Sequence, residues 1–110
     1  MGVKKYVGVY EGDRWPRVYV LEHGNKRSLK VNIRNPLDGG SSAHAWGYIG
    51  SMPKQLAWDL IIDAGLEDID FDAVLDIVLN LRRGSNWELT EQEIRERVKQ
   101  WHAAKQKSQL

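Results

Sequence analysis

Apolar and polar residues alternate along the first third of the chain with the period of two that is typical of a β-strand. The alternation is clearest where Leu29, Val31 and Ile33 share one face and polar residues occupy the other. Just before this segment, Gly24 and Asn25 supply the positive φ angles of a tight hairpin turn, so we expect an antiparallel meander with one buried face. Within residues 3–49, strands are predicted over 3–9, 17–22 and 27–33, and residues 43–49, with Trp46 and Tyr48, are a candidate fourth strand.

After residue 50 the apolar positions recur with the period of an α-helix. Pro53 is tolerated in the first turn of a helix that Ser51 or Met52 would cap, and Gly65 suits the left-handed residue that ends it. The second helix is apolar around more than half of its circumference, which indicates a central position. The helices are predicted over residues 53–64, 70–81 and 90–106.

The third predicted helix differs from the other two because its apolar stripe is narrow. Thr90 and Glu93 form a capping box at its start. Only Ile94, Val98 and Trp101 line one side, so this helix packs at the edge of the domain or against a second copy, as a homodimer through the C-terminal helix. Strands followed by helices predict a single α+β domain over the whole chain: a small antiparallel sheet of three to four strands, packed by two helices, with a third amphipathic helix at the C-terminus.

Length and composition narrow the class of protein. The chain has 110 residues, 42% hydrophobic and 28% charged, which is ordinary for one globular domain and argues against intrinsic disorder. It contains no cysteine, which excludes disulfides and Cys-ligated zinc. Neither a secretory signal nor an apolar run of the roughly 18 residues that span a membrane is visible, so we expect a soluble, cytoplasmic protein with no membrane partner.

The charge is distributed unevenly along the chain. The formal net charge of +1 argues against nucleic-acid binding by bulk charge alone. Residues 54–80 contain one basic and seven acidic residues, whereas residues 1–53 and 81–110 are net basic. Such a distribution suits steering toward a charged partner, or packing of acidic helices against basic strands or a second subunit.

Residues 44–60 carry the most distinctive local pattern of the chain. Eight residues fit a Trp-Gly-Tyr-x-Gly-Ser-x-Pro-x-x-Leu-Ala motif: Trp46, Gly47, Tyr48, Gly50, Ser51, Pro53, Leu56 and Ala57. Together with the earlier Tyr6-Val7-Gly8, this motif resembles that of an uncharacterised family of small bacterial and phage proteins, catalogued as a domain of unknown function. Ala45 and Met52 depart from the family pattern, which has an aromatic or acidic residue and a glycine at these places. The resemblance covers residues 1–80 and implies a phage or prophage setting, but it supplies no biochemical activity.

Two interpretations of this motif stay open. Gly47 and Gly50 flank Tyr48, so that backbone and aromatic rings can approach one another closely. In the first interpretation, the helix N-terminus that follows holds a phosphate or carboxylate beside exposed aromatic rings. In the second and simpler one, Trp46 and Tyr48 pack on the sheet, the glycines make a tight strand-to-helix turn, and Ser51 caps the helix.

Acid–base chemistry has one candidate group of residues. Asp59 and Asp63 are four residues apart and share a face of the first predicted helix. A pocket that joined either carboxylate to His44 and Tyr48 would favour an enzyme, but solvated helix faces carry such pairs more often, and we predict no catalytic residue and no cofactor. The run Asp68-x-Asp70-x-Asp72 lacks the glycine and the glutamate that a calcium loop needs further on, so we also predict no metal site.

Five tryptophans in 110 residues are an excess that suits interface anchors. Trp15, Trp87 and Trp101 lie in turns or on the polar helix, and we expect them to be the most exposed. Trp46 and Trp58 lie in apolar surroundings and are predicted to belong to the core.

The sequence favours a non-enzymatic binding module, phage- or prophage-encoded, that acts on a host macromolecule, with a host protein as the expected partner. A nucleic-acid-binding accessory protein is the alternative, because Arg82, Arg83 and the lysines near Trp101 could contact phosphates beside an aromatic ring. Glutamates crowd the same helix, which weakens that alternative. A small enzyme is the least favoured class. The predicted interaction residues are Trp15, Arg82, Arg83, Trp87 and Trp101.

Overall fold

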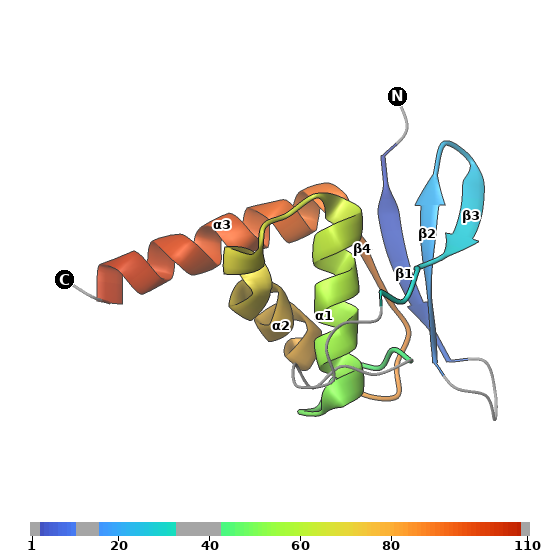
Figure 1. Ribbon diagram of the computed structural model, residues 1–110, viewed down its shortest axis with the longest axis horizontal. Coiled ribbons are helices and arrows are strands. Elements are labelled where there is room, and N and C mark those ends of the chain that lie inside the picture. The colour runs from blue at the N-terminus through green and yellow to red at the C-terminus, as the bar shows by residue number, and fades with distance from the viewer. Residues whose placement is uncertain (1–2, 11–15, 33–42, 109–110) are drawn as a thin grey trace.

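The computed structural model describes residues 3–10, 16–32 and 43–108, and it confirms the α+β class. Within these residues, four antiparallel strands form one sheet in the order β3-β2-β1-β4, and three helices lie on one side of it (Figure 1). The strands are β1 (Lys5–Val9), β2 (Arg17–Glu22), β3 (Asn25–Ser28) and β4 (Trp87–Thr90). The helices are α1 (Ser51–Ala64), the short 3₁₀ helix η2 (Asp68–Asp70), α2 (Phe71–Asn80) and α3 (Glu91–Ser108).

The three α-helices begin and end within two residues of the predicted bounds. Gly65 ends α1 in the left-handed conformation, with φ +69°, as expected. The capping box is also confirmed: the Thr90 hydroxyl accepts from the Glu93 N–H at 3.0 Å, and the Glu93 carboxylate accepts from the Thr90 N–H at 3.1 Å. The cap predicted for α1 is wrong, because Gly50 occupies the N-cap position and Ser51 is already the first helical residue.

The fourth strand is not the predicted one. Residues 43–49 form bends and irregular backbone, whereas β4 lies between α2 and α3 and pairs with β1, Gly8 opposite Trp87 and Lys5 opposite Thr90. The expected order of strands first and helices afterwards is therefore wrong. A strand of four residues has too little periodicity to be found locally; its partner, about 80 residues earlier in the chain, defines it.

The β2–β3 hairpin differs from the prediction in its turn and its length. Positive φ angles occur at His23 (53°) and Gly24 (78°), one residue earlier than expected, because Glu22 pairs with Asn25 and leaves a two-residue loop. The strand predicted over 27–33 ends at Ser28. The Leu29 N–H still donates to Val18 O at 2.9 Å, but beyond it the chain turns toward α1.

One core cluster draws on the sheet and on all three helices. Figure 1 shows α1 between the sheet and α2, while α3 crosses one end of the helical layer and its C-terminal half runs away from the sheet. The predicted apolar face of α1 is buried along its whole length: Leu56, Ala57, Leu60, Ile61 and Ala64. Trp46 is fully buried, as expected. Trp58 is not; it is half-buried and stacks on Phe71, with 4.1 Å between ring centroids.

Candidate functional site

The distinctive motif forms a junction with the segment that follows α2. Gly47 N donates to Val78 O at 3.1 Å, and Trp46 Nε1 donates to Ser85 O at 3.0 Å. Gly47 has φ +82°, and a Cβ added there would lie 2.5 Å from the backbone nitrogen of Arg83. Both observations call for glycine at this position. The close approach inferred from the glycines therefore exists, and the backbone that approaches is that of residues 81–83.

An aromatic cluster supports this junction from inside. Trp46 meets Tyr10 and Trp87 edge to face, with ring centroids 5.1 and 5.6 Å away. Gly8 leaves room for the Trp87 indole across the sheet, since a Cβ at Gly8 would lie 2.0 Å from Trp87 Nε1. Trp87 is thus half-buried against the core, as Trp58 and Trp101 are, so the prediction of an exposed Trp87 is wrong. Its buried Nε1 has no acceptor among the described residues.

A hollow of about 320 Å³ opens over this cluster, and we call it the Tyr48–Arg83 hollow. The Arg83 guanidinium carbon lies 4.6 Å from the centroid of the Tyr48 ring, which is a cation–π contact. The described lining residues are Tyr10, Pro16, Ala45, Tyr48, Met52, Arg83 and Gly84. Aromatic, thioether and guanidinium groups therefore meet at one place, and Arg83 is the one charged residue among those described in the lining.

The predicted interaction residues separate into two groups in space. Arg82 and Arg83 are exposed and lie beside the motif, as does Trp87. Trp101 lies elsewhere, half-buried in a hollow between α2 and α3, with the Lys105 ammonium 5.2 Å from its ring centroid. Trp15 falls outside the described residues.

Asp59 is a buried hub on α1. Its Oδ1 accepts from the backbone N and the side-chain Nδ2 of Asn32, at 3.0 and 3.1 Å, and from Gln55 Nε2 at 2.9 Å. Its Oδ2 lies 2.5 Å from His44 Nε2. A carboxylate that is fully buried requires partners of this number and quality. The hub ties Asn32, which follows β3, and His44, which precedes the motif, to the same helix.

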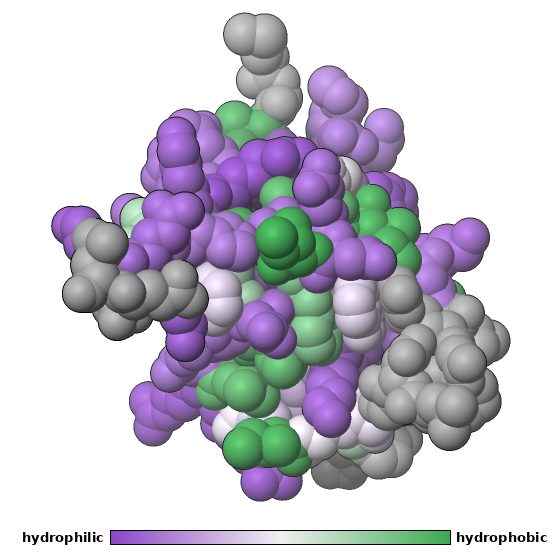
Figure 2. All heavy atoms as spheres, turned by 60° about the vertical axis from the view of Figure 1, so that its left-hand side comes forward, coloured by the Kyte–Doolittle hydropathy of each residue, from purple (hydrophilic) through white to green (hydrophobic). Residues whose placement is uncertain are grey.

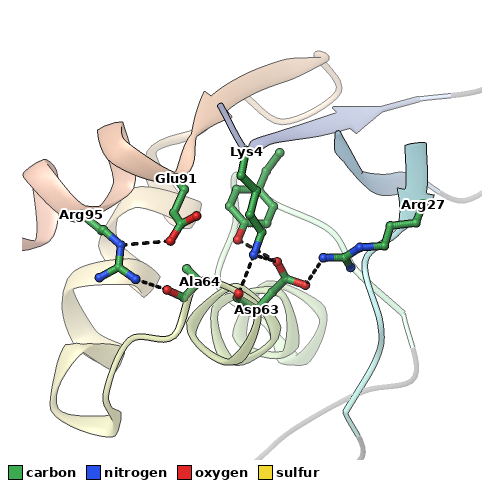
Figure 3. A network of polar contacts seen from close by, with 7 residues as sticks. Lys4, Arg27, Asp63, Ala64, Glu91 and Arg95 are labelled. Carbon is green, nitrogen blue, oxygen red and sulfur yellow. Dashed lines mark hydrogen bonds and ion pairs between the residues drawn. The ribbon is translucent and has the colours of Figure 1, made fainter. Parts of the chain in front are cut away.

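Asp63, one turn later, is part of a different network (Figure 3). Its carboxylate oxygens contact Lys4 Nζ at 2.6 Å and Arg27 Nη2 at 2.9 Å, and accept from the Tyr6 hydroxyl at 2.9 Å. Burial opposes the charge of Asp63, but the hydrogen bonds from Lys4, Arg27 and Tyr6 outweigh it and lower the pKa of this carboxyl. Burial and the bond to Asp63 raise the pKa of Tyr6.

The acid–base group considered from sequence is only partly assembled. His44 and Asp59 lie within hydrogen-bond distance, but Tyr48 lines the Tyr48–Arg83 hollow, which neither Asp59 nor Asp63 lines. In the described part of the chain, no cluster of three or more His, Asp or Glu side chains could hold a metal ion. Asp59 and Asp63 therefore bind other residues of the protein, and no described carboxylate lines the Tyr48–Arg83 hollow.

Sequence reasoning missed three residues that shape the hollow: Tyr10, Pro16 and Met52. Tyr10 anchors the segment after α2, since its hydroxyl accepts from Gly84 N at 3.2 Å and its N–H donates to Asn86 Oδ1 at 2.8 Å. The local sequence around Tyr10 gives no sign of these contacts. Met52 is the exception, because the sequence already marks it as a departure from the family pattern, which has a glycine at this place.

No family model matches the chain, and neither a curated protein nor a solved structure shows significant similarity to it. None of the described helices combines the length and the apolar character needed to cross a membrane.

Proposed function

We propose that this protein is a non-enzymatic binding module that recognises a partner protein through the Tyr48–Arg83 hollow. The observation that carries the proposal is an exposed arginine over a half-exposed tyrosine, beside the close approach at Gly47 and next to the fully buried Trp46. The support beneath the hollow is held by edge-to-face rings and by a glycine that no other residue can replace without strain. Aromatic and arginine side chains on a rigid support are the usual anchors of protein interfaces.

The lining indicates the chemistry of the partner. Met52, Tyr10 and Tyr48 offer apolar and aromatic surface, and the Arg83 guanidinium offers a fork that fits a carboxylate. The complementary ligand is a protein segment with an apolar side chain next to an Asp, a Glu or a terminal carboxylate. If the phage or prophage setting implied by the motif holds, the partner is a host protein in the cytoplasm.

This surface is a better candidate than a homodimer formed through α3. Hydrophilic side chains cover most of the helical side of the molecule that Figure 2 brings forward, and apolar residues reach that face among them. Beyond Val98, the described side chains of α3 are exposed except for Trp101 and His102, which are half-buried, and the His102 ring already contacts Asp70 at 2.8 Å. Little apolar area is left there for a second copy.

The test compares two neighbouring arginines. Tagged wild-type protein, Arg83→Glu and Arg82→Glu are used to capture protein from lysate of a bacterial host, with and without nuclease treatment, and the affinity of any captured protein is measured by titration. Arg82 is the matched control because it is equally charged and exposed but does not line the hollow. We expect Arg83→Glu to weaken binding at least tenfold and Arg82→Glu to change it by less than about threefold.

Two results would overturn the proposal. Equal losses in the two variants would mean that general positive charge, not the hollow, attracts the partner. Loss of all bound material on nuclease treatment would support the nucleic-acid alternative instead. Circular dichroism of both variants checks that the fold is intact.

A further inference from the structure

The face of the sheet that points away from the helices has its own chemistry. Burial alternates along β1 and β2: Tyr6, Gly8, Val18 and Val20 are buried, and the residues between them are not. No described helix packs against this second face, and Figure 1 shows the helices on the opposite side of the sheet. We call it the outer sheet face.

Tyr19 occupies the centre of the outer sheet face. It pairs with Val7 on β1 and with Ser28 on β3, so its ring lies in the middle of a row across three strands. In the adjacent row, Leu21 lies between Lys5 and Lys26. Residues two apart on a strand share a face, so the half-exposed Tyr19 and Leu21 form one apolar and aromatic strip.

Three cations surround this strip. Lys5 and Lys26 stand on either side of Leu21, and Arg17 precedes Tyr19 by two residues on the same face. The Lys26 ammonium lies 4.1 Å from the centroid of the Tyr19 ring. In the described part of this face the only carboxylate is that of Glu88, which pairs with Lys5 at 2.6 Å. Among the residues that the structure describes, this face is therefore net positive around an aromatic centre.

We propose that the outer sheet face binds single-stranded nucleic acid. A base stacks on the Tyr19 ring, Val7 and Leu21 contact its neighbours, and Arg17, Lys26 and Lys5 bind phosphates. Lys26 can leave the ring for a phosphate because its side chain is long and its residue is exposed. The bases of a duplex are paired and stacked on one another, whereas an aromatic ring on a sheet face stacks with bases that are already unstacked.

The charge argues against a second copy of this chain as the occupant. A second copy of this chain would bring the three cations against three more, so the face does not complement itself. This proposal does not depend on the Tyr48–Arg83 hollow, since none of the residues named on the outer sheet face lines that hollow. Failure of one proposal therefore leaves the other standing.

Fluorescence anisotropy with a labelled oligothymidylate of about twenty nucleotides tests the proposal, since single-strand sites span roughly 4–16 nucleotides per small β-domain. Tyr19→Ala should weaken binding about tenfold, and Tyr19→Phe should restore it, because the phenyl ring still stacks. Arg17→Gln and Lys26→Gln should each lower the slope of log affinity against log salt by about 0.7. Lys30→Gln is the matched control, since Lys30 is exposed beyond the end of β3 and lines a hollow together with Asp59 and Asp63, on the α1 side of the sheet.

The proposal is overturned if wild type shows no binding at low salt. It is also overturned if Tyr19→Ala binds like wild type, or if Lys30→Gln lowers the salt slope as much as Lys26→Gln. Tighter binding of a duplex than of the single strand would also contradict it. Arg83→Glu, which changes the hollow alone, should bind the oligonucleotide within about threefold of wild type.

Discussion

Asp59 and Asp63 lie one turn apart on the same side of α1, yet their surroundings differ in kind. Asp59 is fully buried, and its donors are amides, a backbone N–H and an imidazole. The Asp63 side chain is 13% exposed and contacts two cations and a phenol. The first carboxylate joins segments inside the protein, whereas the second holds Lys4 and Arg27 together near the surface.

The difference shows that residue type and position on the helix do not determine how much a carboxylate contributes to the stability of the fold. Around Asp59, four donors share one carboxylate in a buried site, and its removal takes a hydrogen bond from each of them, although Gln55 Nε2 keeps the backbone O of Asn32 at 2.9 Å. Around Asp63, Lys4 keeps a second acceptor, the backbone O of Asp63 at 2.7 Å, and the exposed Arg27 can turn to water. We therefore expect unequal costs when each aspartate is removed.

The largest effect is expected for Asp59→Ala. It leaves the Asn32 and Gln55 amides and the His44 ring without their shared acceptor in a buried site, which should lower the free energy of unfolding by about 3–5 kcal/mol. Urea unfolding followed by tryptophan fluorescence measures it. Asp59→Asn, which keeps one oxygen, should lose clearly less. If Asp59→Ala lowered the free energy of unfolding by less than about 1 kcal/mol, the hydrogen bonds to Asp59 would not be important for stability.

Asp63→Ala should cost less, about 1–2 kcal/mol in the same urea experiment. The reason is that both cations retain water or backbone partners once the carboxylate is gone. Arg27→Gln is the control for the more exposed half of the network, and it should change the free energy of unfolding by under about 1 kcal/mol. If Asp63→Ala cost as much as Asp59→Ala, the contrast between the two sites would be lost.

Tyr6→Phe removes one hydrogen bond from the Asp63 network and leaves the buried ring in place. We expect a loss of about 1 kcal/mol at neutral pH. Because the fold raises the Tyr6 pKa, the neutral phenol stabilises the protein below the unfolded pKa of about 10, and this contribution is lost as pH rises further. Wild type should therefore lose more stability than Tyr6→Phe in alkaline urea titrations. A parallel decline of both proteins would contradict this assignment.

The two aspartates also show how far the sequence could be interpreted. Spacing alone placed them on one helix face, and the helix bounds, the Gly65 cap and the α+β class were predicted correctly for the same reason: each depends on residues close together in the chain. The partners of the two aspartates, in contrast, lie far from them in the chain. His44 lies 15 residues from Asp59, and Lys4 lies 59 residues from Asp63. No local pattern states which distant side chain will face a carboxylate.

The same limit applies to the Tyr48–Arg83 hollow and to β4. The glycines of the motif indicated a close approach of backbone, but the approaching segment lies more than 30 residues later. Gly8, noted only as part of a short early element, has its physical reason in Trp87, on the strand opposite. The sequence thus predicted which glycines would allow a close approach of the backbone, but it did not predict which segment would pack against them.

The smallest expected effect comes from the acid titration of Asp63. Its pKa is lowered in the folded protein, so the unfolded chain binds a proton more readily, and the stabilisation from Asp63 is complete above the unfolded pKa of about 4. It is lost as pH falls through the lower, folded pKa. The gap in unfolding free energy between wild type and Asp63→Asn should be constant from pH 7 to about 5 and should close below about 4. Every other carboxylate titrates in both proteins and cancels in the difference. A gap that does not narrow at all between about pH 5 and about pH 3 would mean that Asp63 stabilises the fold through packing and not through its charge.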